Sequence, residues 1–155
     1  MNFSPYSLVC AEGNDIIQTL TTTPSILRVE LETWKGVRGY AQYSNFKVAN
    51  EAQNYRIFVQ GFSGNVSRDG MDYGNGFGFT TYDKDNDGRD PTSKDCAEER
   101  HGAWWHDRCT LTNLNGVYHQ EDGYDWEAMS WIEFPDPDRY FTPLRKAKMM
   151  IRWIK

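Results

Sequence analysis

TTYDKDNDGRD, residues 80–90, sets three aspartates at alternate positions and follows them with a glycine. Carboxylates this close repel one another unless a cation lies among them. Asp83, Asp85 and Asp87 match the first half of the calcium loop found between two helices, where alternate side chains direct oxygens at one centre. The match then fails, because Lys94 stands where that loop needs a bidentate glutamate. The stretch therefore predicts either a calcium loop of another kind or a solvated acidic turn that binds nothing.

The chain is long enough to form one domain with its own core. It has 155 residues, of which 39% are hydrophobic and 15% are aromatic. A chain of this length can bury about 68 to 70% of its unfolded surface, and each aromatic side chain supplies a large apolar area. We therefore expect a single folded domain and no disorder.

Charge and hydropathy exclude two classes of partner. The formal net charge is −5, and acidic and basic residues are interspersed, so no basic face is present for nucleic acid. No apolar run approaches the roughly 20 residues of a membrane span. The opening residues 1–13, MNFSPYSLVCAEG, contain no basic region, and no signal peptide is predicted there. Neither nucleic acid nor membrane insertion is expected.

Alternation of apolar and polar residues predicts an antiparallel meander. Ile26–Glu32 alternates leucine and valine with charged residues, as a half-buried strand does. Tyr40–Val48 and Tyr55–Phe62 are rich in aromatic and β-branched residues and give similar signals. Met149–Ile154 is predicted as a closing strand.

Helical signals are sparse. Residues 16–20 form one short predicted helix, with Asn14 or Asp15 as its N-cap. From Ser63 to Gly123, glycine, aspartate and asparagine recur, so we expect long ordered loops held by internal ties such as a metal or a disulfide. The predicted fold class is α+β, a mainly antiparallel sheet with short helices and long tied loops.

The three cysteines allow two interpretations. Cys96 and Cys109 lie 13 residues apart and Cys10 lies far from both, which suggests one disulfide and one remaining thiol. Alternatively, His101 and His106 lie between Cys96 and Cys109, and the four side chains form a chemically possible tetrahedral zinc set. The residues alone leave both interpretations open.

Two sequons for N-linked glycosylation begin at Asn2 and Asn65. They read Asn-Phe-Ser and Asn-Val-Ser, and such acceptors belong to the surfaces of secreted proteins. So short a motif also arises by chance, and the sequons carry little weight alone.

Four strings carry a resemblance to one known family; in chain order they are FTTYDKDND, CAEERHGAWWHDRC, LTNLNGVY and MMIR. Together they resemble the fibrinogen C-terminal-like domain family, which includes fibrinogen chains, ficolins, tachylectins, angiopoietins and tenascins. Upstream strings such as GNDIIQTLT and LRVELETW resemble the middle part of that domain, and the resemblance runs from Gly13 to Arg152.

The resemblance implies a domain organisation. Residues 13–155 correspond to a partial domain that comprises the family's middle and C-terminal subdomains. Residues 1–12 are expected to be a divergent segment, with the family's N-terminal subdomain missing. Cys10 is then expected to be a free thiol or an intermolecular bridge, which leaves a homo-oligomer possible.

The resemblance also implies a Ca²⁺ site. Asp85 and Asp87 correspond to the family's calcium carboxylates, and main-chain carbonyls complete the shell. The first predicted carbonyl is that of Arg89 and the second that of Pro91, although the segment before Cys96 is longer than in many relatives. The remaining aspartate of the string is expected to cap the turn or to add a nearby charge.

The resemblance further implies a Cys96–Cys109 disulfide, and in several relatives the peptide before the second cysteine, here Arg108–Cys109, is cis. In the family the tied loops form a ligand pocket beside the metal. The residues predicted to contact a ligand are Arg100, Trp105, Arg108, Cys109, Thr110, Tyr124 and Asp125. A tryptophan pair within a disulfide loop more often packs the loop onto the core, which is the alternative for Trp105.

Three residues depart from the acetyl-binding lectins of the family. Arg100, Thr110 and Thr142 stand where an aromatic, a histidine and a tyrosine are common. These differences weaken an acetyl-sugar pocket without excluding it.

The function that the resemblance implies is recognition, not catalysis. The primary expectation is a secreted, calcium-stabilised module that binds glycans or acetylated groups in innate defence. The alternative is a module of the angiopoietin, tenascin or fibrinogen type that binds a cell-surface protein through the same pocket region. No enzyme is expected, since no serine or cysteine nucleophile lies at a recognisable spacing from a histidine.

Overall fold

A sheet of long strands and a layer of loops share the chain. The computed structural model describes residues 7–9 and 13–154. The elements are, in chain order, β1 (Ser7–Val9), α1 (Asn14–Leu20), β2 (Ser25–Thr33), β3 (Arg38–Val48), η1 (Glu51–Gln53), β4 (Ile57–Gly64), η2 (Asp72–Gly74), α2 (Cys96–Glu99), β5 (Thr112–Asn113), β6 (Ser130–Trp131) and β7 (Leu144–Trp153).

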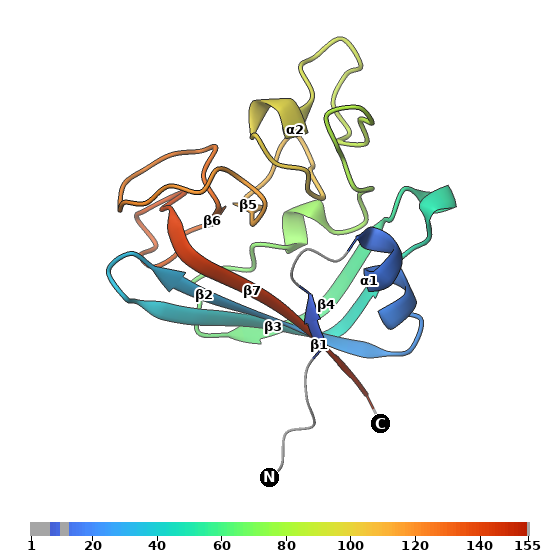
Figure 1. Cartoon of the computed structure of the whole chain (residues 1–155), viewed down its shortest axis with the longest axis horizontal. Coiled ribbons are helices and arrows are strands. Elements are labelled where there is room, and N and C mark those ends of the chain that lie inside the picture. Colours follow the sequence, from blue (N-terminus) through green and yellow to red (C-terminus); the bar gives the residue numbers. More distant parts are fainter. Residues whose placement is uncertain (1–6, 10–12, 155) are drawn as a thin grey trace.

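The main sheet has the strand order β1-β7-β2-β3-β4, and every neighbouring pair is antiparallel. The last strand of the chain, β7, therefore lies between β1 and β2 (Figure 1). Ser7 pairs with Ile151, so part of the segment before residue 13 joins the sheet, although the sequence predicted no strand there. β5 and β6 form a second sheet of two strands.

The predicted class of fold is confirmed, and each predicted strand has a counterpart. In β2 every second residue is buried, as the alternation of its sequence predicted. Leu27 pairs with Tyr43 of β3 and Val29 with Ala41, and these four side chains are 0% exposed. A two-residue period is thus sufficient to place the long strands.

Two strand ends were predicted wrongly. Tyr55 has a φ of 50° in a turn, and β4 begins only at Ile57. β7 begins at Leu144, well before the predicted start at Met149, because Leu144 and residues 146–148 pair with β2 despite the lysines among them. Backbone pairing, rather than apolar alternation, extends this strand.

The predicted helix is present, but its predicted cap is wrong. Gly13 is the N-cap residue, no side chain caps the helix, and Asn14 is the first residue of α1. Asp15 instead accepts a hydrogen bond from the Tyr55 hydroxyl at 2.6 Å. No helix in the described part of the chain is both long enough and apolar enough to cross a membrane.

The core lies on one side of the main sheet, where α1, α2 and the loops also lie (Figure 1). Its largest fully buried side chains include Trp105, Trp131, Tyr43 and Phe46. The Trp105 indole donates to the Tyr55 carbonyl at 2.8 Å, and the Trp131 indole donates to the Arg68 carbonyl at 3.0 Å. These indoles therefore bury their rings without leaving the N–H group unpaired.

Gly70 tests how tightly the loops pack on the core. A β-carbon added there would lie 2.2 Å from Thr112 Oγ1 and 2.6 Å from the Trp131 ring, whereas one added at Gly123 would have no atom within 4 Å. We expect Gly70→Ala to lower the free energy of unfolding by about 1 to 3 kcal/mol through overpacking. Gly123→Ala should change it by less than about 0.5 kcal/mol. Urea unfolding of both variants measures the difference, and equal stabilities would contradict the packing described here.

Candidate metal centre and ligand-facing loops

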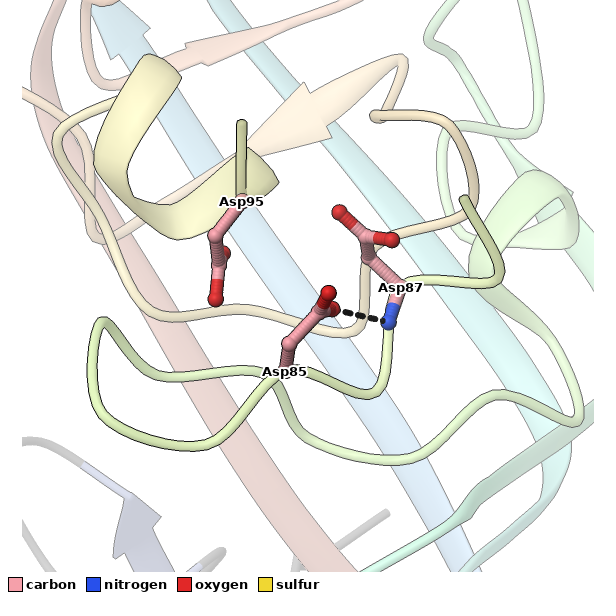
Figure 2. Close-up of side chains that lie close together, drawn as sticks. All are labelled: Asp85, Asp87 and Asp95. Carbon is pink, nitrogen blue, oxygen red and sulfur yellow. Dashed lines mark hydrogen bonds between the residues drawn. The ribbon is translucent and has the colours of Figure 1, made fainter. Parts of the chain in front are cut away.

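Three carboxylates meet at the turn that opens the loop layer. Asp85, Asp87 and Asp95 each place a carboxylate oxygen within 4.8 Å of the others (Figure 2). Asp85 is exposed, Asp95 is partly buried and Asp87 is only 1% exposed. The sequence predicted the first two members, and the structure brings them together as expected.

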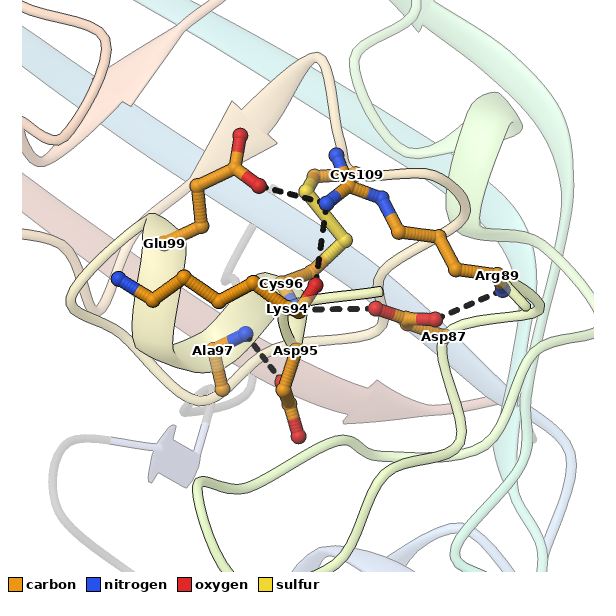
Figure 3. Close-up of polar contacts among 8 residues, drawn as sticks. All are labelled: Asp87, Arg89, Lys94, Asp95, Cys96, Ala97, Glu99 and Cys109. Carbon is orange, nitrogen blue, oxygen red and sulfur yellow. Dashed lines mark hydrogen bonds and ion pairs between the residues drawn. A yellow bond between two sulfur atoms is a disulfide. The ribbon is translucent and has the colours of Figure 1, made fainter. Parts of the chain in front are cut away.

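Asp87 joins this turn to the disulfide loop. Its Oδ1 accepts the Arg89 amide at 2.8 Å, and its Oδ2 accepts the Cys96 amide at 2.9 Å (Figure 3). Its own amide donates to Asp85 Oδ1 at 2.9 Å, and its carbonyl accepts the Arg108 amide at 3.2 Å. A buried carboxylate is stabilised when backbone amides donate to it. Asp87 therefore holds the turn and the disulfide loop together, in addition to its predicted role as a metal ligand.

Asp95 is the member that the sequence analysis missed. It is the N-cap of α2 and accepts the Ala97 amide at 2.6 Å. Burial raises the pKa of the Asp95 carboxyl, and the negative charges of Asp85 and Asp87 raise it further. Its neighbour Cys96 donates its amide to Asp87, which places Asp95 beside the turn.

Arg89 braces the same segment from outside the trio. Its guanidinium forms an ion pair with Glu99 and donates to the Lys94 carbonyl at 3.1 Å (Figure 3). The bond to Glu99 raises the pKa of Arg89, and the charges of Asp87 and Asp85 also contribute. The loop is thus closed by side chains and not by the disulfide alone.

The trio has the chemistry that a hard divalent cation requires. Ca²⁺ takes six to eight oxygens at about 2.3 to 2.6 Å, so oxygens on opposite sides of the ion lie about 5 Å apart. One oxygen from each of the three carboxylates lies within 4.8 Å of the others, which is close enough for one ion to contact all three. The carbonyls of Arg89 and Pro91 stay predictions as further ligands. Asp83 accepts the Thr81 hydroxyl at 2.7 Å, as a cap of the turn.

Cys96 and Cys109 form a disulfide, with their α-carbons 5.3 Å apart. The pairing that the resemblance implied is confirmed, and the zinc set is excluded because both of its sulfurs are bonded to each other. His106 contacts the Gly102 carbonyl at 2.9 Å instead, and burial lowers the pKa of its ring. The Arg108–Cys109 peptide is cis, as the resemblance implied. Cys10 lies outside the described residues.

Three of the predicted ligand contacts are buried. Trp105 is 2% exposed and packs edge-on against Phe79, with ring centroids 5.0 Å apart. Cys109 and Thr110 are buried as well, and the Thr110 hydroxyl donates to the Thr112 carbonyl at 2.8 Å. The prediction that Trp105 presents its ring to a ligand is therefore corrected in favour of packing. These side chains support the loops from within.

The other predicted contacts lie at the surface. Arg108 is exposed and donates to the Gly88 carbonyl at 3.3 Å. Tyr124 is 70% exposed, and Asp125 receives an ion-pair contact from His119 at 2.8 Å. Their role in binding stays a prediction.

Arg100 lies among aromatic rings that the sequence analysis did not assign. Its guanidinium carbon is 4.7 Å from the Trp126 ring centroid and 5.0 Å from that of Phe141. Its Nη1 donates to the Trp126 carbonyl at 2.7 Å, and Tyr124 packs edge-on against Phe141. Burial lowers the pKa of Arg100, although an arginine remains charged at neutral pH. Only the aromatic character of residues 124–141 hinted at this cluster.

The sheet, its loop layer, the disulfide and the acidic turn together define a class of protein. Comparison with known proteins identifies that class. The family model for the C-terminal globular domain of fibrinogen beta and gamma chains matches residues 10–154. The chain belongs to this family, as its motifs predicted. Angiopoietin-related protein 7 of Mus musculus is 46% identical over 142 residues, which cover 90% of this chain and 40% of that protein. Angiopoietin-4 of Homo sapiens is 38% identical over 143 residues, which cover 90% of this chain and 27% of that protein.

Solved structures agree. The fibrinogen-like globe domain of human ANGPTL6 superposes with a TM-score of 0.83 at 32% identity, over 92% of this chain and 63% of that one. A lamprey fibrin D-dimer, complexed with the peptide Gly-His-Arg-Pro-amide, gives a TM-score of 0.75 at 27% identity, over 92% of this chain and 51% of that one. The chain spans less than half the length of the curated relatives described above.

The carboxylate trio predicts calcium binding that depends on Asp95. Asp95→Asn keeps a side-chain oxygen that can cap α2 but removes one charge from the trio, so we expect calcium affinity to fall about tenfold or more. Asp83→Asn, which changes a carboxylate bonded to Thr81, is the matched control and should bind calcium as the unchanged chain does. Titration calorimetry measures both affinities. Unaltered affinity in Asp95→Asn would remove this residue from the site.

Proposed function

We propose that the chain is an extracellular, calcium-stabilised binding domain whose loop face recognises a protein partner. The family is shown, and angiopoietins and angiopoietin-related proteins are among its relatives. These relatives favour the protein-binding alternative over the glycan-binding function expected first. A disulfide that bridges the loops also fits an oxidising, extracellular setting.

The position of Arg100 carries the proposal. An acetyl group needs a small apolar wall, and ligand pockets of this kind are lined mainly by apolar and aromatic side chains. Here the Arg100 guanidinium already lies close to Trp126 and Phe141 and hydrogen-bonds to the Trp126 carbonyl. The chain's own cation thus occupies the aromatic surroundings that an acetyl-binding site would use.

The same cluster has the composition of a protein interface. Arginine, tyrosine and tryptophan are the residue types that contribute most to protein–protein binding energy. Tyr124 is 70% exposed, Trp126 41% and Tyr140 49%, all in the loop layer. Glu127 adds a carboxylate whose charge acts on Arg100, so the surface offers both charges next to apolar area. A protein segment with mixed chemistry matches such a surface better than a neutral acetyl group does.

Calcium would be held by Asp85, Asp87 and Asp95, and it would supply the positive charge that three neighbouring carboxylates lack. A metal bound at Asp87 would also fix the disulfide loop, because the other contacts of Asp87 are with the amides of Cys96 and Arg108. The residues that bind the metal are therefore those that fix the start of the disulfide loop. In this proposal the metal site stabilises the loops, and Arg100 and its aromatic neighbours contact the partner.

The fibrin D-dimer gives a precedent for the class of ligand. That structure, which shares this fold, is complexed with a short peptide. A loop surface that accepts a peptide can also accept a segment of a folded protein. The peptide itself is not proposed as a ligand of this chain, because the positive charges of Arg100 and Arg108 would repel its arginine.

Binding to cultured cells tests the proposal. We expect fluorescently labelled chain to bind in calcium, and binding to disappear after mild protease treatment of the cells but to persist in excess N-acetylglucosamine. Arg100→Ala should weaken binding about fivefold or more, as removal of an interface hot spot does. Arg38→Ala, at an exposed arginine of β3, is the matched control. Calcium-dependent retention of the chain on an acetylated resin would instead support the glycan-binding function.

A further inference from the structure

The main sheet has a second face that the loop layer does not cover. Helices and loops of the described chain lie on one side of the sheet (Figure 1). In β2 the residues that alternate with the buried ones belong to the other face. A groove of about 400 Å³ runs over this open face. Its lining includes Arg28, Tyr40, Lys146, Lys148 and, at one margin, Asn65.

Asn65 is the first residue of a sequon that the proposed function does not use. It lies in a bend directly after β4 and is exposed, as is Ser67, while Val66 between them is 7% exposed. The Asn65 amide nitrogen of the main chain donates to the Tyr40 carbonyl at 3.1 Å. The bend is thus fixed to the edge of β3, with both acceptor residues of the motif facing solvent.

The side-chain amide of Asn65 is held in one orientation. Its Oδ1 accepts the Tyr40 amide at 2.7 Å, so the oxygen faces the sheet. Its Nδ2 makes no hydrogen bond within the described part of the chain. An N-linked sugar is attached at Nδ2 and leaves Oδ1 free to accept, so the bond to Tyr40 survives the modification.

We propose that Asn65 carries an N-linked glycan whose first sugars lie in this groove. In the reaction, Nδ2 forms a bond to the anomeric carbon of a lipid-diphosphate-linked oligosaccharide. The bond from that carbon to the diphosphate oxygen breaks, and the displaced lipid diphosphate and one proton from Nδ2 are released. The inference rests on the extracellular placement in the proposed function.

The groove has the chemistry to hold sugar rings. Lys146 and Lys148 form no ion pair within the described residues and can donate to hydroxyl groups. Arg28 stacks on the Tyr40 ring at 3.9 Å, and its Nε donates to Glu30 Oε1 at 3.0 Å. The other N–H groups of Arg28 and the other carboxylate oxygen of Glu30 can bond to sugar hydroxyls in this groove. A volume of about 400 Å³ lies in the range of small-ligand sites. The attached glycan, rather than a diffusing ligand, is the occupant because Asn65, to which it is attached, itself lines the groove.

The test expresses the full chain behind a cleavable leader in cultured secretory cells. Peptide mass spectrometry of both the secreted and the retained chain reads the occupancy of Asn65 separately from Asn2. We expect Asn65 to be glycosylated in the unchanged chain and in Ser63→Ala, a neighbouring exposed serine outside the motif. Ser67→Ala should lose the glycan while keeping the Asn65–Tyr40 bonds, and its melting curve checks that it folds. Unmodified Asn65 in both fractions of the unchanged chain would overturn the proposal.

A second measurement locates the sugars. Amine acetylation should modify Lys146 and Lys148 several-fold faster after enzymatic removal of the glycan, while Lys84, in the acidic turn, should not change. Equal reactivity of the two lysines before and after removal would overturn occupancy of the groove. Occupancy would also be overturned if the lysines stayed protected without the glycan and light scattering showed that this protection accompanies dimer formation. Ser67→Ala is expected to retain calcium binding and cell binding, so failure of the glycan proposal is distinguishable from failure of the proposed function.

Discussion

The loop layer depends on the hydrogen bonds of one buried carboxylate. Asp87 is 1% exposed, and burying an ionised carboxylate is costly unless it is paired or hydrogen-bonded. Amides of Arg89 and Cys96 donate to its side chain, and the amide of Arg108 donates to its carbonyl. The turn around Asp87 and the two ends of the disulfide loop, at Cys96 and Arg108, therefore meet at a single residue. The disulfide joins the same loops covalently, because Cys96 is bonded to Cys109, the residue after Arg108.

The parts of the fold that follow from local pattern could be predicted from the sequence. β2 was placed almost to the residue because Leu27, Val29 and Leu31 alternate with charged residues, and a two-residue period is visible without any partner strand. The start of β7 could not be predicted, because Lys146 and Lys148 are strand residues only through their pairing with Glu32 and Glu30 of β2. The cap of α1 failed for a related reason, since Asp15 bonds to a tyrosine distant in sequence.

The candidate site likewise has residues that could be predicted from the sequence and residues that could not. Asp85 and Asp87 belong to a local string, and the resemblance to a family supplied the disulfide that spacing alone had left open. Asp95 was out of reach, because it approaches the other carboxylates only when the intervening loop folds back. The aromatic neighbours of Arg100 were missed for a similar reason: Trp126 and Phe141 come to it from a separate loop. Exposure is likewise a property of the whole fold: the motif left both ligand contact and packing open for Trp105, and the fold buries it.

The two faces of the sheet suit different tasks for an energetic reason. Binding a partner through flexible loops would require ordering them, which costs free energy at the moment of association. Here the loops are fixed beforehand by the contacts of Asp87, by the disulfide and by indoles such as that of Trp105, which is bonded to the Tyr55 carbonyl. Among the described residues no such layer covers the open face, and its regular strands present charged side chains that need solvent or a hydrophilic cover. The glycan proposed on Asn65 would provide that cover, so the recognition proposed for Arg100 and the protection of the sheet would not compete for the same surface.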